Sequence, residues 1–150
     1  MKQKPKPDIQ QHAENLRMHV WHLAGKIGER HSENPGSLER AAQYIEQEFT
    51  RCGLVPGRQS YGKPPFHNVI AAVAGAAQPE EIIVVGAHYD TVWLSPGADD
   101  NASGVAALLE LACMLAPGRH DRTIRFVAFT NEEQPYAETG EMGSAVYVRD

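Results

Sequence analysis

The feature that most constrains the fold is an uninterrupted apolar run, IIVVGA, over residues 82–87. The run is rich in β-branched residues, and its continuity predicts a central β-strand that is covered on both faces. A second stretch with strand character spans 124–129, and apolar residues recur at helical spacing between the two, over 101–116. Strand, helix and strand in this order predict a right-handed βαβ crossover with parallel strands, and therefore an α/β sheet with helices on both faces.

Further elements are expected on either side of this unit. Apolar residues at alternating steps of four and three predict an amphipathic helix from about 8 to 30. Ser37 is expected to cap a second helix, which Gly53 ends. A strand is predicted over 68–74, and the start of another helix over 143–148. Three histidines lie outside the apolar stripe of the first helix and are expected on a solvated face: His12, His19 and His22.

Length and charge restrict the classes of partner. The chain has 150 residues, which favours one domain over 8–150 behind a flexible tail over 1–7 that alternates lysine and proline. The net charge of −5 argues against a nucleic-acid partner, because phosphates require a basic face. Apolar runs fall short of the ~20 residues that span a bilayer, and none follows the N-terminal lysines as in a signal peptide. We therefore expect no membrane partner and a cytoplasmic location.

The two cysteines are expected to be free. Cys52 and Cys113 both fall on apolar faces of predicted helices, where a thiol usually serves as inert packing material. Two cysteines in a chain of this kind do not indicate a disulfide framework.

Polar groups gather where the predicted strands end and where the crossover helix begins. Ligands bind beyond the carboxyl ends of the strands in an open parallel sheet, so these groups are expected to converge, and imidazole and carboxylate groups are zinc ligands. Each group alone is also explained as a polar strand end, a helix cap or a solvated turn. Packed like charges, however, are costly unless a cation or solvent offsets them. The groups are His88, Asp90, Asp99, Asp100, Glu132 and Glu133.

Three sequence blocks resemble the metal-binding blocks of the aminopeptidase Y family, which includes bacterial leucyl aminopeptidases. They are GAHYDT over 86–91, PGADDNASG over 96–104 and NEE over 131–133. The resemblance covers about 67–148. It implies a zinc-dependent peptidase whose catalytic domain is represented here by its N-terminal portion. It also implies a three-layer α/β/α sandwich with a mixed, largely parallel sheet, of the phosphorylase/hydrolase-like zinc peptidase type.

The resemblance also implies a role for each matching residue. His88 would bind a first zinc, Asp100 would bridge two zincs and Glu133 would bind the second. Glu132 would be the general base for a zinc-activated water that attacks a peptide bond. Asp90 would accept a hydrogen bond from His88 and orient its ring. Asp99 receives no role.

The family pattern includes two further ligands, an Asp and a His, that the sequence up to Asp150 does not supply. We therefore expect zinc to be partial or absent in this chain alone, and the chain to be inactive by itself. An exposed sheet edge is expected to invite self-association. Two alternatives remain. The first is another enzyme on the same scaffold, either a glutaminyl cyclase, which would use one zinc, or a different hydrolase. The second is a non-catalytic remnant that serves as an interaction module.

Overall fold

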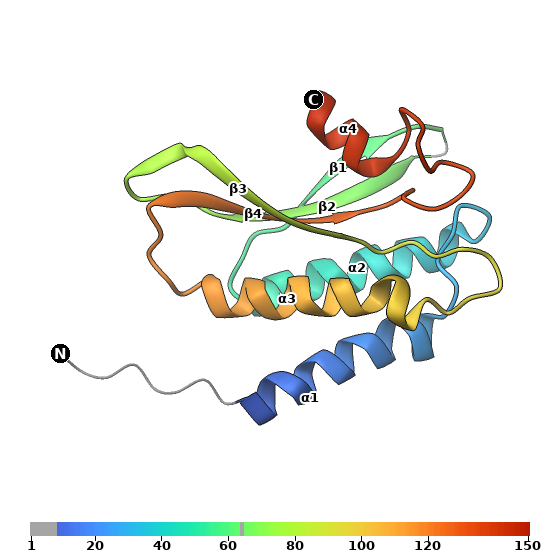
Figure 1. Cartoon of the computed structure of the whole chain (residues 1–150), viewed down its shortest axis with the longest axis horizontal. Coiled ribbons are helices and arrows are strands. Elements are labelled where there is room, and N and C mark those ends of the chain that lie inside the picture. Colours follow the sequence, from blue (N-terminus) through green and yellow to red (C-terminus); the bar gives the residue numbers. More distant parts are fainter. Residues whose placement is uncertain (1–8, 64) are drawn as a thin grey trace.

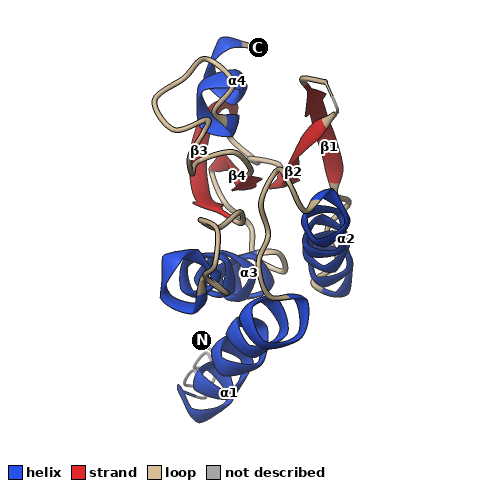
Figure 2. Cartoon of the chain, turned by 90° about the vertical axis from the view of Figure 1, so that its right-hand side faces the viewer, coloured by secondary structure: helices blue, strands red, loops and turns tan. Residues whose placement is uncertain are grey.

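The computed structural model describes residues 9–63 and 65–150; the predicted tail over 1–7 lies outside the described residues. Helices α2 and α3 lie side by side against one face of the sheet, α1 lies beyond them, and α4 lies on the opposite face (Figures 1 and 2). Helices therefore cover both faces, as predicted. The elements in chain order are α1 (Ile9–Val20), η1 (Trp21–Ile27), α2 (Pro35–Arg51), β1 (Gly57–Tyr61), β2 (Phe66–Val73), β3 (Gln78–His88), η2 (Ala98–Ser103), α3 (Gly104–Leu115), β4 (Arg122–Phe129) and α4 (Gly143–Arg149).

The first predicted helix is present as α1 continued by η1, and it ends before Gly28, whose φ is 80°. The prediction of a solvated histidine face is wrong. His19 is only 5% exposed and bonds to the Tyr44 hydroxyl, and the His22 ring stacks on the Tyr44 ring. His12 bonds to the Glu110 carboxylate of α3. Both α2 and α3 contact this helix, so its buried sector is wider than its apolar stripe.

The start of α2 differs from the prediction. Asn34 is the capping residue and Pro35 takes the first helical position, where its fixed φ suits the helix and its missing N–H costs nothing. Ser37 lies inside the helix, buried, and its hydroxyl donates to the backbone carbonyls of Glu29 and Asn34.

The cysteine prediction is also wrong, because Cys52 and Cys113 form a disulfide. Cys52 directly follows α2 and Cys113 lies in the last turn of α3. The helical periodicity placed each thiol on its own helix, but it carried no information on how α2 and α3 lie side by side.

The sheet has the strand order β1-β2-β4-β3. β3 and β4 are parallel and α3 connects them, so the predicted βαβ unit is confirmed. The sheet is mixed, as expected, but it is not largely parallel over the described residues: β2 pairs antiparallel with both β1 and β4. β1 was not predicted, because its sequence GRQSY lacks an apolar run.

β3 is an edge strand of the described sheet, which contradicts the prediction of a covered central strand. Ile82, Ile83 and Val84 are 42%, 46% and 46% exposed. Consecutive residues of a strand point to opposite faces, so both faces are open here. The core lies instead between the sheet and α2 and α3, where Phe49 of α2 packs near Phe126 of β4. Over residues 9–63 and 65–150, every helix is too short or too polar to cross a bilayer.

Candidate metal centre

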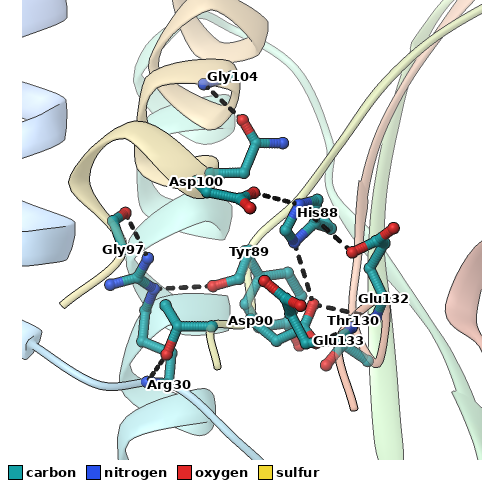
Figure 3. Close-up of polar contacts among 12 residues, drawn as sticks. Arg30, His88, Tyr89, Asp90, Gly97, Asp100, Gly104, Thr130, Glu132 and Glu133 are labelled. Carbon is teal, nitrogen blue, oxygen red and sulfur yellow. Dashed lines mark hydrogen bonds and ion pairs between the residues drawn. The ribbon is translucent and has the colours of Figure 1, made fainter. Parts of the chain in front are cut away.

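The topology brings the predicted site residues together beyond the carboxyl ends of β3 and β4 (Figure 3). His88 is the last residue of β3, Asp100 lies in η2 before α3, and Glu132 follows β4 by three residues. The His88 Nε2 atom lies 3.0 Å from Asp100 Oδ1 and 3.7 Å from Glu132 Oε2. The three segments therefore converge, as the position of the strand ends predicts.

Three of these side chains form a group with the spacing of metal ligands. One ligand atom each from His88, Glu132 and Glu133 lies within 4.8 Å of the other two. Zinc binds such atoms at about 2.0–2.2 Å, so ligands of one ion are separated by up to about 4 Å, close to the spacing observed. Asp100 is outside this group of three, although it touches His88. The donors are imidazole and carboxylates, a set that fits a zinc ion.

Asp90 is buried between His88 and the turn that carries Glu132 and Glu133. Its carboxylate accepts hydrogen bonds from the backbone N–H groups of Glu132, at 3.2 Å, and of Glu133, at 3.0 Å. Its Oδ1 atom also lies 3.5 Å from His88 Nδ1, which is buried and has no hydrogen-bond partner among the described residues. A proton on Nδ1 facing Asp90 would leave the Nε2 lone pair directed at the carboxylate cluster.

The charges of the cluster change the proton affinities of its members. Burial lowers the pKa of His88, but the nearby negative charges of Asp90, Glu132 and Asp100 outweigh it and raise this pKa above its ordinary value. Burial and the neighbouring Asp100 carboxylate raise the pKa of Glu133. Neighbouring negative charge contributes to both shifts, and a bound cation would offset that charge.

Asn68 and Gly143 hold the end of β4 and were not predicted as site residues. The Asn68 side chain is fully buried; its Oδ1 accepts from the Thr130 N–H and its Nδ2 donates to the Gly143 carbonyl. A Cβ on Gly143 would lie 2.3 Å from the Thr130 carbonyl oxygen, so only glycine fits there. In the sequence, the available indication of this role was a polar asparagine at the start of a predicted strand. Its burial and its partners could not be predicted, because the partners are distant in the sequence.

Arg30 is a second residue that the sequence did not single out. It is fully buried behind the site and hydrogen-bonds to the Tyr89 and Gly97 carbonyls (Figure 3). Burial lowers its pKa to about 10, while the Asp90 charge acts in the opposite direction. One arginine after a helix has no pattern that distinguishes it from a surface arginine.

An apolar pocket of about 310 Å³ lies next to the cluster along the chain. Its lining residues lie within three residues of Asp90 or Glu133 in the sequence: they are Val92, Trp93, Gln134 and Pro135. Since one residue spans at most about 3.6 Å, the backbone of these residues lies within about 11 Å of Asp90 or Glu133.

Together, the α/β fold and the imidazole–carboxylate cluster at its strand ends define a class, the α/β proteins with a candidate metal site beyond the carboxyl ends of their strands. Comparison with known proteins gives the family. The chain belongs to peptidase family M28, whose model matches residues 68–150.

Individual relatives agree with this assignment. The uncharacterized protein YfbL of Escherichia coli is 37% identical over 153 residues, covering 94% of this chain and 47% of that protein. Aminopeptidase YwaD of Bacillus subtilis is 47% identical over 68 residues, covering 45% of this chain and 14% of the relative. The chain therefore spans about half the length of its first relative and less of the second.

Solved structures share the fold. The zinc aminopeptidase BSAP of Bacillus subtilis superposes with a TM-score of 0.78 at 16% identity, covering 91% of this chain and 64% of that chain. A glutaminyl cyclase of Porphyromonas gingivalis superposes with a TM-score of 0.73 at 25% identity, covering 92% and 53%.

Proposed function

We propose that the protein is a metal-dependent aminopeptidase that removes N-terminal residues from peptides. The observation that carries this proposal is the convergence of His88, Glu132 and Glu133, with Asp100 beside them, at one edge of the sheet. Membership of a peptidase family and relatives named aminopeptidase support it.

His88, Asp100 and Glu133 are the residues we assign to hold zinc, with two ions in a complete site. When bound, zinc supplies Lewis-acid chemistry, polarising a carbonyl group and lowering the pKa of a water molecule. The Asp100 side chain is 75% exposed, and the excess of carboxylates at this edge favours a cationic group nearby. A free peptide amino terminus is such a group, which supports removal of residues from that end.

Glu132 is assigned as the general base. Its side chain is 48% exposed, so its carboxylate can reach a water molecule, accept its proton and return that proton to the departing amine. Groups of this kind typically contribute about 10²–10⁴-fold to the rate. Asp90 does not touch the reacting atoms in this scheme. It orients His88 and holds the backbone of the turn that carries Glu132.

The test is the Glu132→Gln variant, which keeps the shape of the side chain and removes its basicity. In a protein that also carries the two further ligands of the family pattern, we expect release of leucine from a leucyl anilide to fall by at least about 10²-fold, while zinc content by metal analysis is kept. Glu138→Gln, a change at an exposed glutamate outside the cluster, is the matched control and should leave both unchanged. Full turnover by Glu132→Gln would contradict the assignment of Glu132 as the general base, whereas no turnover by either the variant or the unchanged protein would favour a non-catalytic interaction module.

A second candidate is cyclisation of an N-terminal glutamine with release of ammonia. It is favoured by one observation, the likeness in fold and sequence to the Porphyromonas gingivalis glutaminyl cyclase. A glutaminyl peptide and a leucyl anilide offered to the same preparation separate the two activities. Ammonia release from the first without leucine release from the second would replace the aminopeptidase proposal.

A further inference from the structure

Arg30 is a buried cation whose guanidinium is paired with backbone carbonyls rather than with a carboxylate over the described residues. Its exposed fraction is 0%. A buried charge is costly unless it is fully hydrogen-bonded, so its partners should explain why it is there. Its hydrogen bonds go from Nε to Tyr89 O at 2.7 Å, from Nη1 to Gly28 O at 2.6 Å, Pro96 O at 2.8 Å and Leu23 O at 3.0 Å, and from Nη2 to Gly97 O at 3.1 Å.

These carbonyls join the N-terminal helix to both ends of one segment, 89–97, which connects β3 with η2. Tyr89 lies between His88 and Asp90, at the start of the segment. Gly97 ends it, three residues before Asp100. The guanidinium therefore fixes the distance between Tyr89, which directly follows His88, and Gly97, which lies shortly before Asp100.

The backbone of Arg30 reinforces the same attachment. Its N–H donates to the Thr91 hydroxyl at 3.0 Å, and its carbonyl accepts from the Thr91 N–H at 2.9 Å. The packing leaves no space at the other end: a Cβ on Gly97 would lie 2.4 Å from Thr91 Cγ2 and 3.0 Å from Arg30 Nη2. One residue thus holds the segment near its start, at Tyr89 and Thr91, and at its end, at Pro96 and Gly97.

We propose that Arg30 is a positioning residue of the metal centre: its guanidinium orders residues 89–97 and thereby sets the spacing between His88 and Asp100. Arg30 itself touches neither of those side chains. The part of the inference that concerns metal binding rests on the proposed function, whereas the ordering of the segment does not.

The ordering is tested by hydrogen exchange in Arg30→Lys and Arg30→Ala. Lysine keeps the charge and the stem but lacks the fork that reaches several carbonyls. We expect exchange of peptides covering 89–97 to rise by about tenfold or more in Arg30→Lys, as local opening becomes easier, with peptides from β2 and β4 unchanged. Added guanidinium, but not ammonium, should restore slow exchange in Arg30→Ala. If Arg30→Ala does not fold by circular dichroism, Arg30→Lys decides.

Arg58→Lys is the matched control, because Arg58 also uses its whole fork, but on Glu39 and Glu46 of α2. The Arg58→Lys substitution should not change hydrogen exchange in peptides covering residues 89–97. Equal exchange in wild type and Arg30→Lys, or the same acceleration in Arg58→Lys, would overturn the proposal.

Zinc titration by calorimetry then tests the link to the site. Groups that orient metal ligands typically affect metal affinity by about 10–100-fold, and we expect a loss of this size in Arg30→Lys and none in Arg58→Lys. A wild-type chain that binds no zinc would mean that the ligands of this chain do not suffice without the two further ligands of the family pattern, and the exchange result would then decide the role of Arg30. Faster exchange with unchanged zinc affinity would refute the positioning role.

Discussion

Asp90 lies 4% exposed between the His88 ring and the turn that carries Glu132 and Glu133. The resemblance to the aminopeptidase Y family implied a contact between Asp90 and His88. The two backbone N–H groups that it also binds come from a segment more than forty residues away. The Asp90 carboxylate thus links the segment after β3 to the segment after β4. The two segments lie close together because β3 and β4 are paired in parallel.

Asp90→Asn should therefore affect both the stability and the zinc affinity of the protein. The amide keeps the shape but loses the charge, and its nitrogen cannot accept from a backbone N–H. We expect the free energy of unfolding in urea to fall by about 1–3 kcal/mol and zinc affinity to fall by about 10–100-fold. Asp99→Asn is the control, since Asp99 is exposed and has no assigned role. Equal effects of the two variants on stability and zinc affinity would contradict the role of Asp90 in joining His88 to the turn that carries Glu132 and Glu133.

Elements are held together by polar contacts as well as by the apolar core. α1 is joined to α2 through His19 and Tyr44, and to α3 through His12 and Glu110. These contacts explain why a helix with Ile9 78% exposed still packs firmly. The burial of His19 also makes the attachment of the N-terminal helix sensitive to pH.

His19 gives this sensitivity a definite sign. Burial lowers its pKa below 6.5, and the Glu48 and Glu110 charges only partly offset this. As pH falls through about 6.5 the unfolded chain takes up a proton that the folded protein does not, so stability is lost on acidification. Urea unfolding between pH 7 and pH 5 should show a smaller loss for His19→Gln, which does not titrate, than for wild type. Parallel curves for the two proteins would contradict this.

The disulfide links the end of α2 to the last turn of α3 and closes a loop with a sequence separation of 61. We expect Cys52→Ala/Cys113→Ala to lower the free energy of unfolding by about 2–4 kcal/mol, mainly because the unfolded chain is less constrained. Reductant should destabilise the wild type by a similar amount and leave the double variant unaffected. Two titratable thiols in the unreduced, unfolded protein would show that the bond is not formed. Because such bonds are rare in cytosolic proteins, the bond weakens the basis of the cytoplasmic prediction, which stays a prediction.

The sequence predicted those elements whose apolar pattern is local. α3, β4 and the βαβ order follow from periodicity and from Pro117 and Gly118, and the convergence at the strand ends follows from that order. It did not predict β1, whose residues are polar, or the burial of His19, because these depend on which element lies alongside. Arg30 was missed for the same reason, since its partners are carbonyls, which any residue provides.

At the scale of the whole molecule, the sheet ends in an apolar edge. β3 pairs with β4 on one side, and on the other side it pairs with no strand among residues 9–63 and 65–150. Ile82, Ile83 and Val84 are between 42% and 46% exposed along that edge. A long apolar edge strand presents unpaired N–H and C=O groups to any chain of matching shape.

We therefore expect this chain to self-associate through β3. Sedimentation velocity should show a dimer or larger species whose fraction rises with protein concentration, and Ile83→Lys should shift the chain to the monomer, because a lysine on the edge strand opposes pairing with a second copy. Val55→Lys is the control, since Val55 is 89% exposed but lies between α2 and β1, away from the edge. Any hydrolytic activity that needs ligands from a second copy would fall together with the dimer fraction. Monomers at all concentrations, or equal effects of the two lysine variants, would rule out β3 as the contact.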